Sequence, residues 1–462
     1  MTRKLFGTDG IRGVAGEPPL DAPTVFAVGR ALGEFLREQR AAGSPLDSAR
    51  GKQDPRVLLG EDTRESSPWV TRYLAGGLRA AGVEAVSAGV LPTPAIARLV
   101  RARGFAAGAM VSASHNPYRD NGVKLIGANG MKLPDETEAR LEERIRALVA
   151  SGLDPQPLAP LVDMSLAGDY IEQLRQATPA NLWEDFKGLH LVVDCANGAA
   201  AGVAPKLFRS LGAGVTAIHA APDGKNINAG CGALHPESLA AKVVEVHAQL
   251  GVAFDGDADR AIFVAGSGRI VNGDGVLLAC ARWMKEKRLL KGGCVVGTVM
   301  ANLGLEVALK AGGLPLVRTA VGDRYVLEEM LHRGANLGGE QSGHIIFLDD
   351  SPAGDGPLTA LKVLTILAER DTSLDELVAD LKVFPQTLKN IRVREKRPLE
   401  ELPAVEKAIR EATTALGARG RVIVRYSGTE PLLRVMVEAE TEADVQRWTD
   451  HICRAVGTSL GA

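Results

Sequence analysis

Two loops of this 462-residue chain carry side chains that together could transfer a phosphoryl group. Ser114 offers a hydroxyl in the run Ser112-Ala-Ser-His-Asn-Pro117, directly after a predicted strand. Asp255, Asp257 and Asp259 offer three carboxylates on alternate residues, also after an apolar strand. Hard oxygen ligands of this kind suit Mg²⁺. A hydroxyl beside a divalent cation is typical of phosphoryl-transfer sites.

The sequence of the serine loop does not decide which of its two serines is the nucleophile. Ligands in open α/β sheets gather beyond the carboxyl ends of strands, and Ser114 follows such an end. Asn116 and Pro117 favour a turn there, so an ordinary surface turn is one alternative. Ser112 is a second candidate nucleophile, because residues two apart in a strand share a face. Lys124 could place a positive charge near a phosphate or relay a proton, or it could be a solvated lysine.

The acidic loop has three alternatives to a magnesium site. An EF-hand needs Gly at its sixth position and Glu at its twelfth, where this chain has Arg260 and Gly266, so that interpretation fails. A strand ending in Asp-x-Asp also resembles haloacid-dehalogenase-type phosphatases, in which the first Asp attacks phosphorus. That family usually continues with Thr or Val, where this chain has Asp259. A solvated acidic turn is the third alternative, but close carboxylates repel one another, so a bound ion is the simpler account.

Two further polar loops could bind a sugar phosphate. In Gly339-Glu-Gln-Ser-Gly-His344, Glu340 and Ser342 could hold adjacent sugar hydroxyls, and His344 could donate to an oxygen or carry a proton. A helix cap or a polar turn is the alternative.

The second polar loop is Arg425-Tyr-Ser-Gly-Thr-Glu-Pro431, which follows a predicted strand. Ser427, Thr429 and the backbone N–H groups around Gly428 could form an anion nest, and Arg425 adds charged donors suited to phosphate. A plain hairpin loop is the alternative. A phosphatase needs only one phosphate-binding site, whereas an enzyme that moves phosphate between two ends of one sugar needs two such sites.

The elements that must position these loops alternate between strand-like and helix-like patterns, which predicts parallel sheets covered by helices. We expect four domains: residues 1–160 with the serine loop, 161–260 ending in the acidic loop, 261–372 with the sugar loop, and a smaller mixed domain at 373–462. The predicted strands are Val57–Leu59, Val83–Ser87, Ala106–Val111, Leu191–Asp194, Val215–Ile218, Val252–Phe254, Cys294–Gly297, Leu316–Thr319, Gln386–Val393, Arg421–Val424 and Leu433–Glu438. The predicted helices are Pro68–Ala81, Thr93–Arg103, Glu136–Ala150, Gly202–Leu211, Pro236–Leu250, Pro403–Leu416 and Glu442–Val456.

Composition excludes several classes of protein. The net charge of −2 argues against a broad nucleic-acid surface. Five scattered cysteines without a Cys-x-x-Cys pair indicate thiols in a reducing compartment. The start lacks the apolar stretch of a signal peptide, and no apolar run is long enough to cross a bilayer, so we expect a soluble cytoplasmic protein.

Five motifs occur in the order found in the α-D-phosphohexomutases, and the chain resembles that family along nearly its whole length. The N-terminal motif and Gln341 are most similar to its bacterial phosphoglucosamine mutases. The motifs are Phe6-Gly-Thr-Asp-Gly-Ile-Arg-Gly13, Ser112-Ala-Ser-His-Asn-Pro117, Asp255-Gly-Asp-Ala-Asp-Arg260, Gly339-Glu-Gln-Ser-Gly-His344 and Arg425-Tyr-Ser-Gly-Thr-Glu-Pro431. Ala258 replaces a frequent Gly and Tyr426 a frequent Pro or small residue, and neither change removes a ligand.

The resemblance implies four domains around a central cleft, the first three with related α/β sheets. It implies interconversion of glucosamine 6-phosphate and glucosamine 1-phosphate through a bisphosphorylated sugar. A sugar bisphosphate would serve as activator and a homodimer is expected. Sister mutases acting on mannose or glucose phosphates share the same parts, and a sugar-phosphate-binding regulator without catalysis is a further alternative.

The resemblance also implies roles for individual residues. Ser114 would carry the phosphate and, with the three acids, hold Mg²⁺. Arg12 and Arg260 would flank the phosphoserine. Lys124 and His344 would handle protons. The residues that would bind the sugar hydroxyls and the non-reacting phosphate are Glu340, Ser342, Arg425, Ser427, Gly428 and Thr429.

Overall fold

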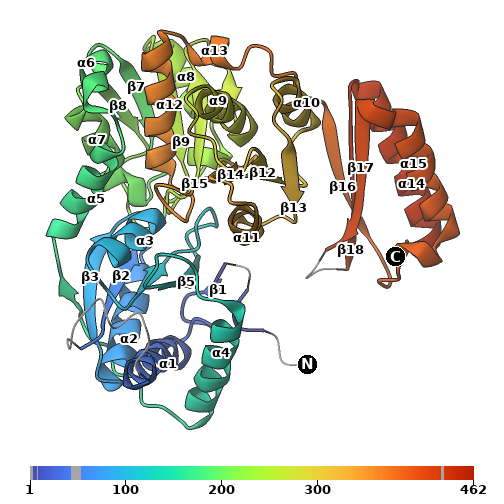
Figure 1. Ribbon diagram of the computed structural model, residues 1–462. Coiled ribbons are helices and arrows are strands. Elements are labelled where there is room, and N and C mark those ends of the chain that lie inside the picture. Colours follow the sequence, from blue (N-terminus) through green and yellow to red (C-terminus); the bar gives the residue numbers. More distant parts are fainter. Residues whose placement is uncertain (1–3, 8, 43–53, 428–430, 462) are drawn as a thin grey trace. The chain divides into compact units, whose positions relative to one another are not determined.

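The computed structural model describes residues 4–7, 9–42, 54–427 and 431–461 (Figure 1). The chain divides into two compact units, one of residues 1–300 and 314–379 and one of residues 301–313 and 380–462. Within the described residues, no helix combines the length and the apolar character that crossing a bilayer requires.

The first sheet of the larger unit carries the serine loop. Its strand order is β1-β5-β4-β2-β3-β6, in which β2, β3 and β4 run parallel and β5 runs antiparallel to β4. Val57 and Leu59 of β2 belong to a core that also contains side chains of α1, α2 and α4, while Leu58 points to the other face, which α3 covers. The strands are β1 (Ile11–Val14), β2 (Arg56–Glu61), β3 (Glu84–Val90), β4 (Ala107–Val111), β5 (Asp120–Gly127) and β6 (Leu161–Val162), and the helices are α1 (Ala22–Ala41), α2 (Ser67–Ala80), α3 (Thr93–Ala102) and α4 (Asp135–Ala150).

The second sheet carries the acidic loop. Its order is β11-β10-β9-β7-β8, with β7 parallel to β8 and β9, and β10 antiparallel to β9. The strands are β7 (His190–Asp194), β8 (Gly214–Ile218), β9 (Leu250–Phe254), β10 (Ala261–Ala265) and β11 (Ile270–Val271), and the helices are α5 (Ser165–Gln176), α6 (Trp183–Phe186), α7 (Ala204–Ser210) and α8 (Glu237–Glu245).

The third sheet, of order β13-β12-β14-β15, carries the sugar loop between β14 and β15. The strands β12, β13 and β14 are parallel, and β15 closes the edge antiparallel to β14. The strands are β12 (Val295–Thr298), β13 (Leu316–Thr319), β14 (Leu337–Gly339) and β15 (Ile345–Phe347), and the helices are α9 (Gly273–Glu286), α11 (Asp323–Arg333), α12 (Gly356–Arg370) and α13 (Leu374–Leu377).

The smaller unit has a three-stranded antiparallel sheet of order β16-β18-β17. Its helices α14 and α15 pack against the sheet around a core of its own, which includes Val405, Val435 and Ile452. Its elements are α10 (Leu303–Ala311), β16 (Gln386–Arg392), α14 (Pro403–Leu416), β17 (Gly420–Tyr426), β18 (Leu432–Ala439) and α15 (Glu442–Leu460).

The fold class predicted from the sequence is confirmed, because the chain has three α/β sheets and one smaller α+β domain. The prediction of a helix over Pro236–Leu250 is too long, since α8 ends at Glu245. His247 then adopts a left-handed φ of 50°, which reverses the chain into β9.

Candidate active site

The serine loop and the acidic loop meet at the carboxyl ends of β4 and β9. Ser114 is 1% exposed, and its Oγ donates a hydrogen bond to Asp255 Oδ2 at 2.6 Å. Ser114 has a left-handed φ of 52°, a conformation that costs energy in a residue with a Cβ. The spatial association that the sequence predicted, an alcohol beside three acids, is therefore present in the folded chain.

Ser112 is committed to holding this loop. It is fully buried, its Oγ donates to Asp62 Oδ2 at 2.6 Å, and it accepts the backbone N–H of Ser114 at 2.9 Å. Asp62 also forms a fully buried ion pair with Arg64. The hydroxyl of Ser112 is therefore engaged in contacts that hold the loop. The hydroxyl of Ser114 is the one that contacts the three acids.

Two side chains far apart in sequence grip the same two carbonyl groups of the serine loop. Arg64 Nη2 donates to the carbonyl oxygens of Ser114 at 3.1 Å and Asn116 at 2.6 Å. Asn228 Nδ2 donates to the same oxygens at 2.9 and 3.3 Å. Sequence analysis missed both residues. Arg64 had a usable signal, because it follows the predicted strand Val57–Leu59 at the same sheet edge.

The three acids can hold a cation. Oxygens of Asp255, Asp257 and Asp259 lie within 4.8 Å of one another. Asp257 Oδ1 and Asp259 Oδ1 are buried and have no hydrogen-bond partner among the described residues. Buried carboxylate oxygens without partners are costly, and a hard divalent ion would satisfy them. Ala258, the departure from the family motif, adopts a left-handed φ of 56°, so the loop keeps a shape that glycine would adopt more readily.

The acids experience different electrostatic surroundings. Burial, reinforced by the charges of Asp259 and Asp257, raises the pKa of Asp255 well above its usual range. Burial also opposes ionisation of Asp257. The charge of Lys124 and hydrogen bonds from Thr93 and Lys124 outweigh burial and hold the pKa of Asp257 below its usual range. The bonds to Asp257 Oδ2 measure 2.6 Å from Thr93 Oγ1 and 2.9 Å from Lys124 Nζ.

Lys124 is a buried cation in a ring of carboxylates. Its Nζ lies 2.9 Å from Asp257, 3.2 Å from Asp9 and 3.7 Å from Asp259. Burial alone would lower the pKa of Lys124, but these charges outweigh it and raise that pKa well above its usual range. Asp9 also contacts Lys132 Nζ at 2.8 Å. Asp9 stands inside the N-terminal motif, yet sequence analysis assigned it no role.

Buried donors without acceptors surround the hydroxyl loop. Arg12 Nε, Arg260 Nε and His115 Nδ1 have no hydrogen-bond partner among the described residues. Arg12 also forms an ion pair with Asp9 and donates from Nη1 to Asn116 Oδ1 at 3.4 Å. Burial, followed by the charges of Arg260 and Arg12, lowers the pKa of His115 to about 4. The surroundings are therefore cationic and suited to an anion.

The sugar loop brings His344 to the acids. His344 Nδ1 lies 3.6 Å from Asp259 Oδ1, and Nε2 accepts the backbone N–H of Gly354 at 3.1 Å. Burial would lower the pKa of His344, but Asp259, then Asp323 and Glu340, outweigh it and raise that pKa to about 9. The Gly354 bond instead requires an unprotonated Nε2. We favour the neutral ring in a loaded site, because a cation on Asp259 would neutralise part of the charge that raises the pKa.

Glu340 and Ser342 lie on the same loop. Glu340 Oε1 accepts the backbone N–H of Gly322 at 3.0 Å, and Ser342 Oγ donates to Glu340 Oε2 at 3.3 Å. Ser342 is exposed and Glu340 is half-buried, and the two side chains are joined by this hydrogen bond.

A cavity of about 250 Å³ lies beside these groups. Its lining includes Asp9, Lys124, Asp259, Asp323 and His344, so side chains from the segments around all three sheets line one space.

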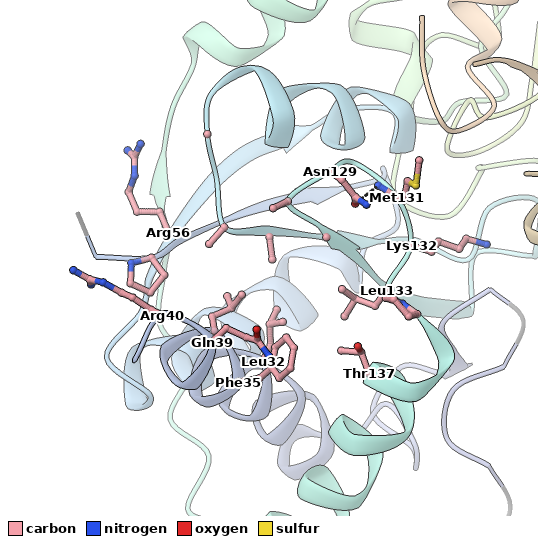
Figure 2. Close-up of a pocket in the computed structure, with 18 of the residues that line it drawn as sticks. Leu32, Phe35, Gln39, Arg40, Arg56, Asn129, Met131, Lys132, Leu133 and Thr137 are labelled. Atoms are coloured by element: carbon pink, nitrogen blue, oxygen red, sulfur yellow. Dashed lines mark hydrogen bonds between the residues drawn. The ribbon is translucent and has the colours of Figure 1, made fainter. Parts of the chain in front are cut away.

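Another cavity, of about 440 Å³, lies next to α1 (Figure 2). Leu32 and Phe35 of α1 face Leu133 and Thr137 across it. None of the described residues of the predicted site lines this cavity, so its size does not make it the active site.

The phosphate loop belongs to the smaller unit. Arg425 lies in β17, and Ser427 is buried, with its N–H donating to the Leu432 carbonyl at 2.8 Å and its own carbonyl accepting from Lys396 Nζ at 2.6 Å. Gly428 and Thr429 lie outside the described residues.

Comparison with family descriptions matches all four parts of the phosphoglucomutase/phosphomannomutase family. The alpha/beta/alpha domains I, II and III match residues 3–150, 168–268 and 272–384, and the C-terminal domain matches residues 388–455.

Curated relatives and solved structures agree with these matches. The chain is 51% identical to a phosphoglucosamine mutase of Solibacter usitatus, with 100% of both chains covered. It is also 51% identical to one of Koribacter versatilis, covering 99% of this chain and 98% of the relative. A phosphoglucomutase/phosphomannomutase family protein from Burkholderia thailandensis has a TM-score of 0.77 at 27% identity, covering 99% and 98% of the two chains. The fold is also similar to an Aspergillus fumigatus N-acetylphosphoglucosamine mutase solved with GlcNAc-6P and magnesium, with a TM-score of 0.66 at 19% identity and 98% and 96% coverage.

Proposed function

The chain belongs to the phosphoglucomutase/phosphomannomutase family, and we propose that within it the chain acts as a phosphoglucosamine mutase that carries phosphate on Ser114. The observation that carries the proposal is the 2.6 Å contact between Ser114 Oγ and Asp255, beside carboxylate oxygens that have no hydrogen-bond partner among the described residues. The substrate would be glucosamine 6-phosphate or glucosamine 1-phosphate, the pair to which the name of the close relatives refers.

Mg²⁺ is the cation that best suits an all-oxygen site. Asp255, Asp257 and Asp259 would hold it, together with an oxygen on Ser114. When bound, Mg²⁺ supplies positive charge that offsets the charge on the migrating phosphoryl group. The A. fumigatus relative was solved with magnesium, which supports the choice of metal.

The residues around Ser114 suit a phosphoserine. Within the part of the chain that the structure describes, Arg12 Nε, Arg260 Nε and His115 Nδ1 have no hydrogen-bond partner, and a phosphoryl group on Ser114 would supply acceptors. A buried N–H without an acceptor is unfavourable. The unphosphorylated enzyme would therefore have more unpaired hydrogen-bond donors than the phosphorylated enzyme.

The reaction consists of two transfers in opposite directions. In the first, the P–O bond to Ser114 breaks and a P–O bond to the free sugar hydroxyl forms, while a base takes the hydroxyl proton and Ser114 Oγ gains a proton. In the second, the P–O bond at the other end of the bisphosphorylated sugar breaks and a P–O bond to Ser114 Oγ forms, while Ser114 loses its proton and the sugar oxygen gains one. We assign the protons to Lys124 and His344. Lys124 starts as a cation, because neighbouring carboxylates raise its pKa, so it would begin the reaction with a proton to donate.

Binding of the two ends of the substrate would use two loops. Glu340 and Ser342 would accept and donate hydrogen bonds to sugar hydroxyls. Arg425, Ser427, Gly428 and Thr429 would bind the phosphate that is not reacting. A sugar bisphosphate that phosphorylates Ser114 would act as activator, and a homodimer stays a prediction that light scattering can test.

The decisive experiment combines a coupled assay with intact-mass measurement. After incubation with a sugar bisphosphate and Mg²⁺, the parent protein should gain the mass of one phosphoryl group, and Ser114→Ala should lose both that mass and nearly all turnover. Ser112→Ala should keep the phosphoryl group, although it loses two buried hydrogen bonds, each worth about 1 kcal/mol of stability. Phosphorylation of Ser114→Ala would overturn the assignment.

Two controls separate the alternatives. A phosphoserine resists hydroxylamine, whereas the acyl phosphate of an Asp-nucleophile phosphatase would be cleaved. Comparison of kcat/KM for glucosamine, glucose and mannose phosphates distinguishes the proposed substrate from those of sister mutases.

A further inference from the structure

A second group of metal-ligating side chains lies in the second sheet and shares no residue with the three acids. Asp194 ends β7, His219 follows β8, and Cys231 precedes a short 3-10 helix at Gly232–Leu234. One ligand atom from each of the three lies within 4.8 Å of the others. From this cluster we propose a binding site for a borderline divalent cation such as Zn²⁺.

The geometry of His219 supports a bound cation as the partner of its Nδ1. Its Nδ1 lies 3.0 Å from Asp194 Oδ2, yet this shielded nitrogen makes no hydrogen bond with any described residue. His219 also has a left-handed φ of 45°, so the turn that presents it is strained. A cation held by the ring and the carboxylate would bond to this nitrogen, which has no hydrogen-bond partner among the described residues.

The donor set selects the class of metal. A thiol, an imidazole and a carboxylate are ligands typical of Zn²⁺, which accepts sulfur, nitrogen and oxygen in tetrahedral sites. Mg²⁺ prefers oxygen alone, so the two clusters of this chain would take different ions. Three protein ligands leave the fourth position for water.

Access and protonation are compatible with reversible binding. Asp194 and Cys231 are buried, but the His219 side chain is 32% exposed and opens a path to solvent. Burial, followed by the charge of Asp194, raises the pKa of the Cys231 thiol to about 11. The thiol proton must therefore leave to water when the metal binds, and affinity should rise with pH.

The cluster lies directly behind the loop of the three acids. Asp194 already accepts the backbone N–H groups of Ala196 at 2.9 Å and Gly232 at 3.0 Å. The same turn reaches the acidic loop, because the N–H of Ala199 donates to the carbonyl of Gly256 at 2.8 Å. A cation on Asp194 would thus stabilise the support of the acidic loop without contacting substrate.

Cobalt titration tests the site independently of turnover. The full-length protein, stripped of metal and kept in excess Mg²⁺ to fill the all-oxygen cluster, is titrated with Co²⁺. We expect one equivalent to produce the near-ultraviolet sulfur-to-cobalt charge-transfer band, which Zn²⁺ then abolishes by displacement. Cys231→Ser should lose the band, and His219→Gln should weaken Co²⁺ binding by at least about tenfold.

Cys280→Ser is the matched control, because Cys280 is an equally buried thiol in α9, remote in sequence from the cluster. It should retain the band. No band in the parent protein, or a band that survives in Cys231→Ser, overturns the proposal. If circular dichroism shows that Cys231→Ser is unfolded, His219→Gln becomes the deciding variant. His219 is partly exposed, so we expect His219→Gln to fold. An unchanged Co²⁺ affinity in His219→Gln would also overturn the proposal. The result does not depend on the mutase proposal, since no step of this assay involves phosphate.

Discussion

The conformation of Ser114 has to be maintained against its own backbone preference. A left-handed φ of 52° costs of the order of 1 kcal/mol in a non-glycine residue. Arg64 and Asn228 hold the carbonyls of Ser114 and Asn116 from two different sheets, so the loop is fixed from both sides. These two residues would act as positioning residues, because neither directs a group at the hydroxyl itself.

Asn228→Ala tests this positioning. The variant loses the two donations to the serine loop, so Ser114 should be less well aligned and kcat should fall roughly tenfold, equivalent to about 1.4 kcal/mol, with KM little changed. Steady-state kinetics at saturating sugar bisphosphate measures both constants. The exposed Asn181 provides the control, since Asn181→Ala should leave both unchanged. An unaltered kcat in Asn228→Ala would show that Arg64 alone is sufficient.

The residues that local sequence pattern alone singled out, before any resemblance, include Ser114, Asp255 and Arg425, and each of these lies in a motif that follows a predicted strand. Ser114 and Asp255 were found in this way. Asn228 and Asp323 were not, because they become neighbours of the site only through folding. Asn228 lies in a long loop after β8, and Asp323 begins α11, so their local patterns are those of ordinary polar turns and caps. Local sequence cannot show contacts that exist only between separate sheets.

Among the helices, α3, α5 and α12 are joined by one buried carboxylate. Asp355 caps α12 by accepting the N–H of Leu358 at 2.9 Å. The same side chain accepts from Arg98 Nε of α3 at 2.9 Å and from the Tyr170 hydroxyl of α5 at 3.0 Å. Asp355 is fully buried and Arg98 is 9% exposed, so the pair is shielded from water. Removal of the carboxylate would leave a buried positive charge without compensation.

Asp355→Ala should therefore destabilise the larger unit by about 3–5 kcal/mol. Tyr170→Phe is the graded comparison, because it removes one hydrogen bond and keeps the ring, and should cost about 1 kcal/mol. Chemical denaturation followed by circular dichroism measures both. Equal, small effects of the two substitutions would contradict the idea that this carboxylate links the three helices.

Glu138 in the first turn of α4 provides a prediction about pH. It is 7% exposed, and burial, followed by the charge of Asp135, raises its pKa from 4.5 to about 7. The folded protein binds this proton more tightly than the unfolded chain. The free energy that the protonated Glu138 contributes to folding is therefore fully present below about pH 4.5 and is lost as the pH rises through 7. Glu138→Gln mimics the protonated form and should be more stable than the parent at pH 8, by at most about 3 kcal/mol, with little difference near pH 4.5.

Thermal unfolding of both proteins across this pH range measures the effect. The exposed Glu136 on the same helix is the control, since Glu136→Gln should show no pH-dependent difference. A pH-independent difference for Glu138→Gln would mean that folding does not shift the pKa of Glu138, and would contradict the prediction.

The elements themselves were predictable where periodicity is strong. The predicted helix Pro403–Leu416 coincides with α14, and the predicted strand Gln386–Val393 differs from β16 by one residue. Strand direction was harder to infer. β5 and β10 run antiparallel to the strands before them, because each follows a turn too short for a helical crossover. The loops that make these reversals are the serine and acidic loops, where residues serving chemistry obscure the usual turn signals.

At the scale of the whole molecule, the smaller unit is discontinuous in sequence. Residues 301–313 belong to it, although the chain enters and leaves them from the larger unit. Asn302 Nδ2 donates to the Phe384 carbonyl at 3.0 Å, and the N–H of Leu303 donates to Glu438 Oε1 at 2.9 Å. Sequence alone could not assign α10 to this unit, because its neighbours in sequence, β12 and β13, form the third sheet together.

Each unit has its own core, so we expect calorimetry to resolve two unfolding transitions. All three acids lie in the larger unit, and a ligand that binds only the folded form stabilises it by RT ln(1 + [L]/Kd), about 2.7 kcal/mol at a concentration of 100 Kd. Saturating Mg²⁺ should therefore raise the Tm of the transition of the larger unit by a few degrees and leave the Tm of the smaller unit unchanged.

K⁺ at equal ionic strength controls for screening. Asp257→Asn should reduce the shift, since Asp257 Oδ1 is one of the buried oxygens without a partner among the described residues. A single transition that shifts as a whole would show that the two units unfold together, and equal shifts in the parent and in Asp257→Asn would place the stabilising ion elsewhere.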